Sequence, residues 1–283
     1  MSTWRTALAE ATAALGSESD ARWIVEEASG YERAALLVHL DDPVTARCGG
    51  YLSGMVGRRL TGEPLQYVLG RWGFRGLDLM VDRRVLIPRP ETEEVVGWAL
   101  EEVRRLGRQD LVVADLGTGS GAIALSLARE LPGAAVWATD ASEDALDVAR
   151  ANVAGVGIWA GPRVRMVNGE WWAALPGDLR GGIDLVVSNP PYVADAEELP
   201  PEVEDWEPHH ALRAGADGLD AIRVVLGGAC EWLRPGGLLV VEIAPSQASA
   251  VLDLAATTGA ARSEVRRDVR GRERALLAWW PGG

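Results

Sequence analysis

The residues best suited to chemistry in this chain are Ser188–Tyr192, which read Ser-Asn-Pro-Pro-Tyr and directly follow the apolar run Ile183–Val187. The run predicts a buried strand, and open α/β sheets keep their active sites at the carboxyl ends of such strands. Each proline lacks an N–H and holds the preceding residue extended, so the loop is stiff and offers free carbonyl acceptors. Asn189 adds a side-chain carbonyl, and Tyr192 adds a ring with a hydroxyl. The loop suits a substrate with N–H donors, such as a primary amide or an exocyclic amine; a plain strand-ending turn is the alternative.

A glycine-rich turn is the second candidate site. Residues 115–122 read Asp-Leu-Gly-Thr-Gly-Ser-Gly-Ala and end the apolar run 111–116. Glycines there let a ligand approach the backbone, and the following helix presents its N-terminus. The spacing satisfies both the dinucleotide fingerprint, which would use Ala122 as its third position, and the adenosylmethionine pattern, which would use Gly121. Alone, the turn therefore indicates a nucleoside-containing cofactor or a tight strand–helix turn.

Two acidic residues extend this candidate cofactor site. Asp140 ends the next predicted strand, 23 positions after Gly117, where a carboxylate can accept hydrogen bonds from both ribose hydroxyls. As an isolated residue Asp140 would instead be a helix cap, although Ser142 offers a cap nearby. Glu170 and Trp171 follow the third strand, where an acid can accept from an adenine amine while the indole packs on the adenine face. The alternative is that Trp171 and its neighbour cover the edge of the sheet.

The elements that position these residues alternate from residue 110 onward. The alternation predicts an α/β fold in which a mostly parallel sheet is covered by helices on both faces. The last two strands have no helix between them, so they can pair as a hairpin with one strand antiparallel. Strands are predicted at 111–116, 135–139, 163–167, 183–188, 238–243, 263–268 and 275–279, and helices at 122–130, 142–153, 219–233 and 247–258.

The N-terminal third has a different character. Its first 60 residues predict a small helical domain, either a packing appendage or a substrate-docking module, with helices at 3–15, 21–28 (capped by Asp20), 31–40 and 44–60. Glycines and prolines then separate short apolar segments, including 67–69, which predict the strands of a β-hairpin linker. After this linker, Thr92 is predicted to cap a helix at 93–106. The predicted domains are 1–60 (helical), 61–90 (linker) and 91–283 (catalytic).

Composition narrows the class of protein. The chain has 283 residues, of which 48% are hydrophobic and 24% charged, as in globular proteins. The net charge of −13 argues against free nucleic acid as the main partner, because neutralising phosphates requires clustered positive charge. Cys48 and Cys230 show neither metal-ligand spacing nor a disulfide framework, so we expect no metal site. The N-terminus has no export signal, and no apolar run approaches the roughly 18 residues of a membrane span, so we expect a cytoplasmic protein.

Together these motifs resemble a class I S-adenosylmethionine-dependent methyltransferase that acts on an amide or exocyclic nitrogen. The Asn-Pro-Pro-Tyr loop alone does not decide between the two, since adenine-modifying DNA methyltransferases share it. Further motifs narrow the resemblance to the PrmC/HemK family, the peptide chain release factor glutamine methyltransferases, over nearly the full length. These motifs are Leu-Ile-Pro-Arg-Pro-Glu-Thr-Glu at 86–93, Trp-Glu-Pro at 206–208, Ala-Leu at 211–212, Gly-Leu at 218–219 and Val-Glu-Ile at 241–243.

The resemblance implies a Rossmann-like, seven-stranded sheet, S-adenosyl-L-methionine as the cofactor, and class I peptide chain release factors as the protein substrate. The methyl acceptor would be the glutamine of their Gly-Gly-Gln motif. The implied cofactor-binding residues are Gly117, Thr118, Gly119, Ser120, Gly121, Asp140, Glu170, Trp171 and Asn189. The implied substrate-binding residues are Asn189, Pro190, Pro191 and Tyr192, and of these Asn189, Pro190 and Tyr192 are the catalytic ones. The chain departs from the family at Glu170, where we expect Asp, and at Trp206, where Tyr is frequent.

In this hypothesis the nucleophile is an amide nitrogen whose lone pair is delocalised. The side-chain carbonyl of Asn189 and the main-chain carbonyl of Pro190 would accept from the NH₂ group, orient the lone pair and stabilise the growing positive charge. Tyr192 would form a wall beside the glutamine stem. A strong general base is not required, because the nitrogen becomes acidic once methylated, and we interpret His209 and His210 as a solvated pair.

Other functions remain open at this point. Glutamine methylation of a ribosomal protein uses the same chemistry, and adenine methylation of nucleic acid would need a basic face or a target-recognition domain. A non-catalytic cofactor-binding protein or a nicotinamide dehydrogenase would leave the Asn-Pro-Pro-Tyr loop unexplained. We expect a monomer that binds neither nucleic acid directly nor a membrane.

Overall fold

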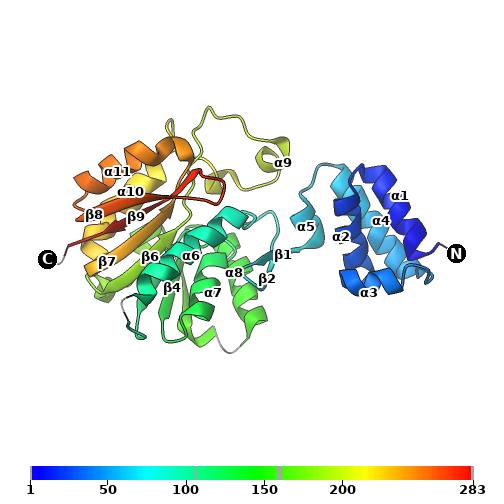
Figure 1. Cartoon of the computed structure of the whole chain (residues 1–283), viewed down its shortest axis with the longest axis horizontal. Coiled ribbons are helices and arrows are strands. Elements are labelled where there is room, and N and C mark those ends of the chain that lie inside the picture. The colour runs from blue at the N-terminus through cyan, green and yellow to red at the C-terminus, as the bar shows by residue number, and fades with distance from the viewer. Residues whose placement is uncertain (1, 106, 158–160, 282–283) are drawn as a thin grey trace. The chain divides into compact units, whose positions relative to one another are not determined.

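The structure is a computed structural model that describes residues 2–105, 107–157 and 161–281 (Figure 1). The chain divides into two compact units. The first comprises Met1–Trp72 with Leu199–Trp206, and the second comprises Gly73–Glu198 with Glu207–Gly283. The domain boundaries expected at residues 60 and 90 stay a prediction. No helix of the described ranges is long and apolar enough to cross a membrane.

The first unit is helical, as expected. Its core is built from side chains that include Trp4, Ile24, Val25 and Met55. Its helices are α1 (Trp4–Leu15), α2 (Glu18–Ser29), α3 (Arg33–Val38), α4 (Ala46–Leu60), α5 (Leu65–Leu69) and the short α9 (Pro201–Glu204).

Two local predictions in this region are wrong. Helix α2 begins two residues before Asp20, because Ser17 is its N-cap and accepts a hydrogen bond from the Asp20 N–H. Residues 67–69 form part of helix α5 rather than a strand. Pro64 precedes α5, Gly70 ends it with φ 74°, and all three residues are buried in the helical core. The hairpin lies just beyond, as β1 (Arg71–Phe74) and β2 (Leu77–Met80).

The second unit contains the predicted α/β sheet. Seven strands lie in the order β5-β4-β3-β6-β7-β9-β8, and β9 is antiparallel to both of its neighbours, so the expected hairpin of the last two strands is confirmed. The strands are β3 (Val112–Leu116), β4 (Ala135–Asp140), β5 (Val164–Asn168), β6 (Ile183–Ser188), β7 (Leu233–Glu242), β8 (Arg262–Arg267) and β9 (Glu273–Trp279). The helices are α6 (Pro90–Arg104), α7 (Ala122–Glu130), α8 (Glu143–Val156), α10 (Asp220–Trp232) and α11 (Ala248–Thr257).

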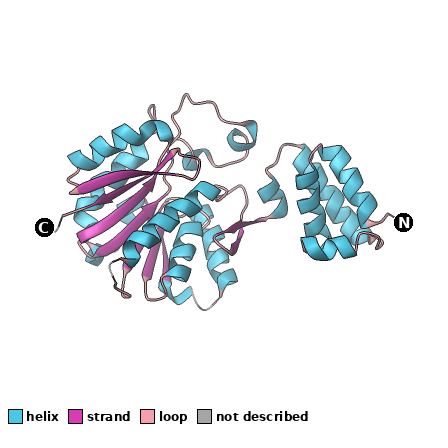
Figure 2. Cartoon of the chain, viewed as in Figure 1, coloured by secondary structure: helices cyan, strands magenta, loops and turns pink. Residues whose placement is uncertain are grey.

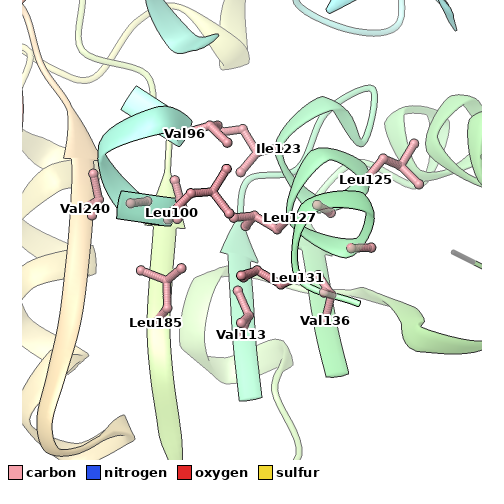
Figure 3. Packing of buried hydrophobic residues seen from close by; sticks show 14 of the residues in the cluster. Val96, Leu100, Val113, Ile123, Leu125, Leu127, Leu131, Val136, Leu185 and Val240 are labelled. Carbon is pink, nitrogen blue, oxygen red and sulfur yellow. The ribbon is translucent and has the colours of Figure 1, made fainter. Parts of the chain in front are cut away.

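The sheet is buried on both faces by separate groups of helices (Figure 2). On one face, Leu100 of α6 and Leu127 of α7 pack over strand residues such as Val113 and Leu185 (Figure 3). On the other face, residues of α10 and α11, such as Ile222 and Val251, cover the sheet. Since both faces are covered, the central strands β3 and β6 and the second half of β7 read as nearly continuous apolar runs, which is why they could be recognised from the sequence.

Helix α6 begins earlier than expected. Its first residue is Pro90, whose missing N–H would be unpaired in a first turn anyway, and its N-cap residue Arg89 makes no side-chain capping bond. The prediction that Thr92 caps this helix is therefore wrong, since Thr92 lies inside the first turn and its buried hydroxyl is available for another partner. The predicted helix end at residue 106 lies outside the described residues.

The strand order creates a crevice at one edge of the sheet. From β3 the chain crosses to β4 on one side, whereas from β6 it crosses to β7 on the other, so the loops after these two neighbours diverge. Ligands bind at such switch points in open α/β sheets. The Ser188 hydroxyl donates to the Leu116 carbonyl at 2.7 Å and ties the two strand ends together. Both motifs singled out in the sequence therefore begin at the same crevice.

Candidate active site

A cavity of about 280 Å³ lies at this crevice. Nine of the residues predicted to bind cofactor or substrate line it, and they come from four separate loops. These are Gly117, Thr118, Gly119, Ser120, Asp140, Glu170, Trp171, Asn189 and Pro191. Three other predicted residues, Gly121, Pro190 and Tyr192, belong to the same loops but are not among the residues that line the cavity.

The glycine-rich turn is held in a conformation that leaves its backbone open to the cavity. Gly117, Gly119 and Gly121 all have positive φ, at 78°, 54° and 82°, which side-chain-bearing residues rarely adopt. Among the described residues, and apart from its chain neighbours, no atom lies within 4 Å of the place where a Cβ on Gly119 would stand, so a ligand can approach there. A Cβ on Gly121 would lie 3.4 Å from the Cβ of Ala149, so Gly121 serves mainly the packing of α7 against α8.

Asp115, directly before this turn, is fully buried. Its Oδ2 accepts from the Thr118 hydroxyl at 2.6 Å and from the Ala124 N–H at 3.0 Å, which fixes the turn to the start of α7. Its Oδ1 has no hydrogen-bond partner in the described part of the chain. Burial raises the pKa of Asp115 from 3.8 to about 7, and the neighbouring Asp140 adds to the rise.

Asp140 points its carboxylate along the edge of the cavity. One oxygen accepts from the Gly119 N–H at 2.8 Å, and the other accepts from the Ser142 N–H at 2.9 Å. Because each carboxylate oxygen has two acceptor positions, both can still accept from a vicinal diol such as that of a ribose. Helix α8 is capped by Ser142, which accepts from the Ala145 N–H, so the capping role considered for Asp140 belongs to Ser142.

The two tryptophans after β5 have different roles. Trp171 lines the cavity, and its ring lies 3.4 Å from the position of a Cβ on Gly117. Its φ of 47° is unusual for a residue other than glycine, and such a conformation costs roughly 1 kcal/mol or more. Trp172 is buried instead, and its Nε1–H donates to the Val225 carbonyl of α10 at 3.1 Å. The strained residue is thus the one that faces the cavity.

The Asn-Pro-Pro-Tyr loop is connected to a buried carboxylate. The Asn189 Nδ2 donates to the Thr92 hydroxyl at 3.3 Å, and that hydroxyl donates to Glu242 Oε2 at 2.7 Å. The Tyr192 hydroxyl donates to Glu242 Oε1 at 3.4 Å, and the Tyr192 carbonyl accepts from Gln247 Nε2 at 3.0 Å. Burial, and then the negative charge of Glu242, hold the pKa of Tyr192 above its ordinary value, so the phenol stays a donor.

A second buried carboxylate, Glu207, connects two loops that border the cavity. Glu207 is buried and accepts from the Ile87 N–H and from the Arg89 guanidinium. Burial raises the pKa of Glu207, and the charge of Arg89 opposes the rise. The pair joins the loop that contains Pro88 to the loop that contains His210, and both of those residues line the cavity.

Several cavity residues were missed in the sequence. His210 is exposed, as expected of a solvated histidine, yet it also lines the cavity. Other lining residues come from the hairpin, the loop before α6 and the first turn of α6, and the Leu-Ile-Pro-Arg-Pro-Glu-Thr-Glu motif was the signal that could have located part of them. They are Phe74, Arg84, Val85, Leu86, Pro88 and Thr92. No group of three or more His, Cys, Asp or Glu side chains in the described ranges is arranged to hold a metal ion.

Known protein families and individual proteins match this chain over most of its length. The PrmC N-terminal domain family matches residues 3–70, and the methyltransferase small domain family matches residues 100–203. The release factor glutamine methyltransferase of Moorella thermoacetica is 44% identical over 286 residues, which cover 98% of each chain. The chain belongs to the release factor glutamine methyltransferase family.

Other matches agree with this family and with its fold. The relative of the same name from Streptomyces coelicolor is 48% identical over 199 residues, covering 70% of this chain and 68% of its own. The crystal structure of a methyltransferase from Pyrococcus furiosus superposes with a TM-score of 0.55 at 18% identity, covering 82% of this chain and all of that one. The predicted family resemblance and fold class are therefore confirmed, and the chain is a methyltransferase whose cofactor is S-adenosylmethionine.

Proposed function

We propose that this chain transfers a methyl group from S-adenosylmethionine to the side-chain amide nitrogen of the glutamine in the Gly-Gly-Gln motif of class I peptide chain release factors. The family supports the substrate class, since relatives that cover nearly the whole chain are named release factor glutamine methyltransferases. The observation that carries the chemistry is the orientation of Asn189, whose Nδ2 is committed to Thr92 and whose carbonyl oxygen is left to accept from a substrate.

The cavity residues fit the cofactor. S-adenosylmethionine, when bound, supplies an electrophilic methyl group on a positively charged sulfur. Asp140 would accept from its ribose hydroxyls, Trp171 would pack on its adenine, and the open backbone at Gly119 would leave space for the rest of the molecule. Glu170 lines the same cavity, and its carboxylate, one methylene further from the backbone than that of the expected Asp, would accept from the adenine amine.

The loop after β6 would act on the substrate amide. The Asn189 side-chain carbonyl and the Pro190 main-chain carbonyl would accept from the two N–H groups and direct the nitrogen lone pair toward the methyl group. As the N–C bond forms and the S–C bond breaks, positive charge develops on nitrogen, and these carbonyl dipoles stabilise it. The methylated nitrogen then loses a proton to solvent, so the mechanism needs no buried general base.

The placement of Tyr192 modifies the expected role of this residue. Its hydroxyl donates to Glu242 and its carbonyl accepts from Gln247, so these two hydrogen bonds fix the Tyr192 end of the loop. We propose that Tyr192 acts by holding Asn189 and Pro190 in place, in addition to bordering the glutamine stem. A monomeric enzyme in the cytoplasm, with a protein rather than a nucleic acid as its direct partner, completes the proposal.

The test is methyl transfer from labelled S-adenosylmethionine to a purified class I release factor, with a Gln→Ala change in its Gly-Gly-Gln loop as the control substrate. We expect label in the wild-type factor and none in the control. The Asn189→Ala variant should lower turnover about 100-fold, because one preorganised acceptor is lost, while S-adenosylhomocysteine affinity stays near wild type. Label in a ribosomal protein or in DNA, with none in the release factor, would overturn the substrate assignment.

A further inference from the structure

Glu242 is a buried acid whose only role in the mechanism above is to accept from the Tyr192 hydroxyl. It ends β7 within the apolar run Leu238–Ile243, and its side chain is 1% exposed. A carboxylate is rarely buried so completely unless it is paired. Here its two oxygens accept from two hydroxyls, those of Thr92 and Tyr192, and both of these residues contact or belong to the Asn-Pro-Pro-Tyr loop.

The direction of these hydrogen bonds decides what Asn189 can offer to a substrate. An ionised carboxylate can only accept, so Thr92 must donate its single hydroxyl hydrogen to Glu242. The Thr92 oxygen is then left only as an acceptor, and it accepts from the NH₂ end of the Asn189 amide. The carbonyl end of Asn189 is consequently the end that remains for the substrate.

We infer that Glu242 is a positioning residue which, through the Thr92 hydroxyl, selects the orientation of the Asn189 amide that accepts from the substrate glutamine. This inference rests on the proposed function and adds to it. Glu242 touches neither cofactor nor substrate. It acts on the reaction by fixing which end of Asn189 faces the methyl acceptor, and it secures the other end of the loop through Tyr192.

Protonation of Glu242 would remove this selection. A protonated carboxyl can donate to Thr92, and the Thr92 hydroxyl can then donate to the Asn189 carbonyl, which turns the amide round. Burial raises the pKa of Glu242 to about 7, so this change falls in an accessible range of pH. Arg274 lowers the pKa through its positive charge and Glu91 raises it, while Asp268 lies 3.6 Å from Arg274 and shares its charge.

The first experiment separates the hydroxyl of Thr92 from its shape. Thr92→Val keeps the side-chain volume but removes the hydroxyl, so the Asn189 amide loses its selection, and we expect kcat to fall about 10- to 100-fold. Thr92→Ser keeps the hydroxyl and should restore most of that loss. Thr257→Val is the matched control. It changes an exposed position on α11 whose hydroxyl donates to the Leu254 carbonyl, and it should behave as wild type.

The second experiment reads the charge of Glu242. At saturating cofactor, wild-type kcat should rise with pH through about 7 as Glu242 loses its proton. Glu242→Gln keeps the shape but cannot ionise, so its kcat should be lower at pH 8 and nearly flat between pH 6 and 8. S-adenosylhomocysteine affinity, measured by calorimetry, should stay within about threefold of wild type in all variants, because none of these side chains is proposed to hold the cofactor.

The outcomes distinguish this inference from the proposed function. If the wild-type enzyme does not methylate the Gly-Gly-Gln glutamine, the function fails before any variant is compared. If the wild-type enzyme is active and Thr92→Val matches it, the role of the hydroxyl is wrong. Retention of the wild-type pH dependence by Glu242→Gln would overturn the role of the charge. Equal losses in Thr92→Ser and Thr92→Val, together with lowered thermal stability, would indicate packing instead.

Discussion

Replacing Asp115 with Asn should change how the stability of the protein depends on pH. Asp115 is fully buried, its Oδ2 accepts from Thr118 and Ala124, and its Oδ1 has no partner among the described residues. Asn can place its carbonyl oxygen where Oδ2 lies and so keep both hydrogen bonds. Its NH₂ group then takes the place of the unpaired oxygen. The variant therefore keeps the contacts and removes the ionisation.

The size of the effect follows from the pKa values. In the unfolded chain Asp115 ionises with a pKa near 3.8, and in the folded chain burial raises the pKa to about 7. Because the folded pKa is the higher one, the contribution to stability is full below pH 3.8 and is lost as the pH rises through 7. Above pH 5 the wild type should lose about 1.4 kcal/mol per pH unit at this residue, and less as the pH nears 7. The loss should reach about 2 kcal/mol by pH 7 and about 2.6 kcal/mol by pH 8.

The assay is urea unfolding of wild type and Asp115→Asn without cofactor, at pH 5 and pH 8. All other titrating groups cancel in the difference between the two free energies of unfolding. The free energy of unfolding of the variant minus that of the wild type should be about 2.6 kcal/mol larger at pH 8 than at pH 5. Asp144→Asn, a change at an exposed position of α8, is the control and should show no such movement. A difference that is the same at both pH values would refute the raised pKa of Asp115.

Two further predictions concern cofactor binding and packing. Asp140→Asn should weaken S-adenosylhomocysteine binding about 10- to 100-fold in calorimetry, because a charge-assisted acceptor contributes about 1.5–3 kcal/mol. The Asn amide can accept from only one of the two backbone N–H groups that Asp140 binds, so the melting temperature without cofactor should fall modestly. Gly228→Ala should lower stability by about 1–2 kcal/mol, since the new Cβ would stand 2.3 Å from Cδ1 of Trp172. A Cβ on Gly227 of the same helix would meet no atom of the described residues within 4 Å outside the helix backbone, so Gly227→Ala should raise stability by up to about 1 kcal/mol. Equal thermal shifts in the two variants would contradict the packing argument.

The parts of the site that the sequence predicted share one property. The glycine-rich turn, Asp140, Trp171 and Asn189 each lie within a few residues of a strand end, and parallel strands bring such ends to one edge of the sheet. Local sequence was therefore enough to predict this part of the cavity lining. Local rules failed where packing decided the outcome, as in α5, where three buried residues formed a helical turn and not the predicted strand.

The hydrogen-bonded connection from Asn189 through Thr92 to Glu242 could not be predicted from local sequence. Thr92 and Glu242 are 150 residues apart, and Asn189 and Thr92 are 97 apart. Their meeting depends on which helix covers which face of the sheet, and on the start of α6 at Pro90, which moved Thr92 out of its predicted capping position. Neither feature is encoded within a few residues of Thr92.

The sequence of β7 nevertheless contains a signal for Glu242. Side chains alternate between the two faces of a strand, so in β7 Glu242 shares a face with Leu238 and Val240, which pack in the core beneath α6 and α7. Leu239 and Val241 face α10 and α11 instead. A lone acid on the α6 face of an apolar strand needs a donor from whatever covers it, and the hydroxyl of the covering helix nearest that strand end belongs to Thr92. An acid at the end of an otherwise apolar strand next to a catalytic loop is thus a signal for a positioning residue, even where no motif assigns it one.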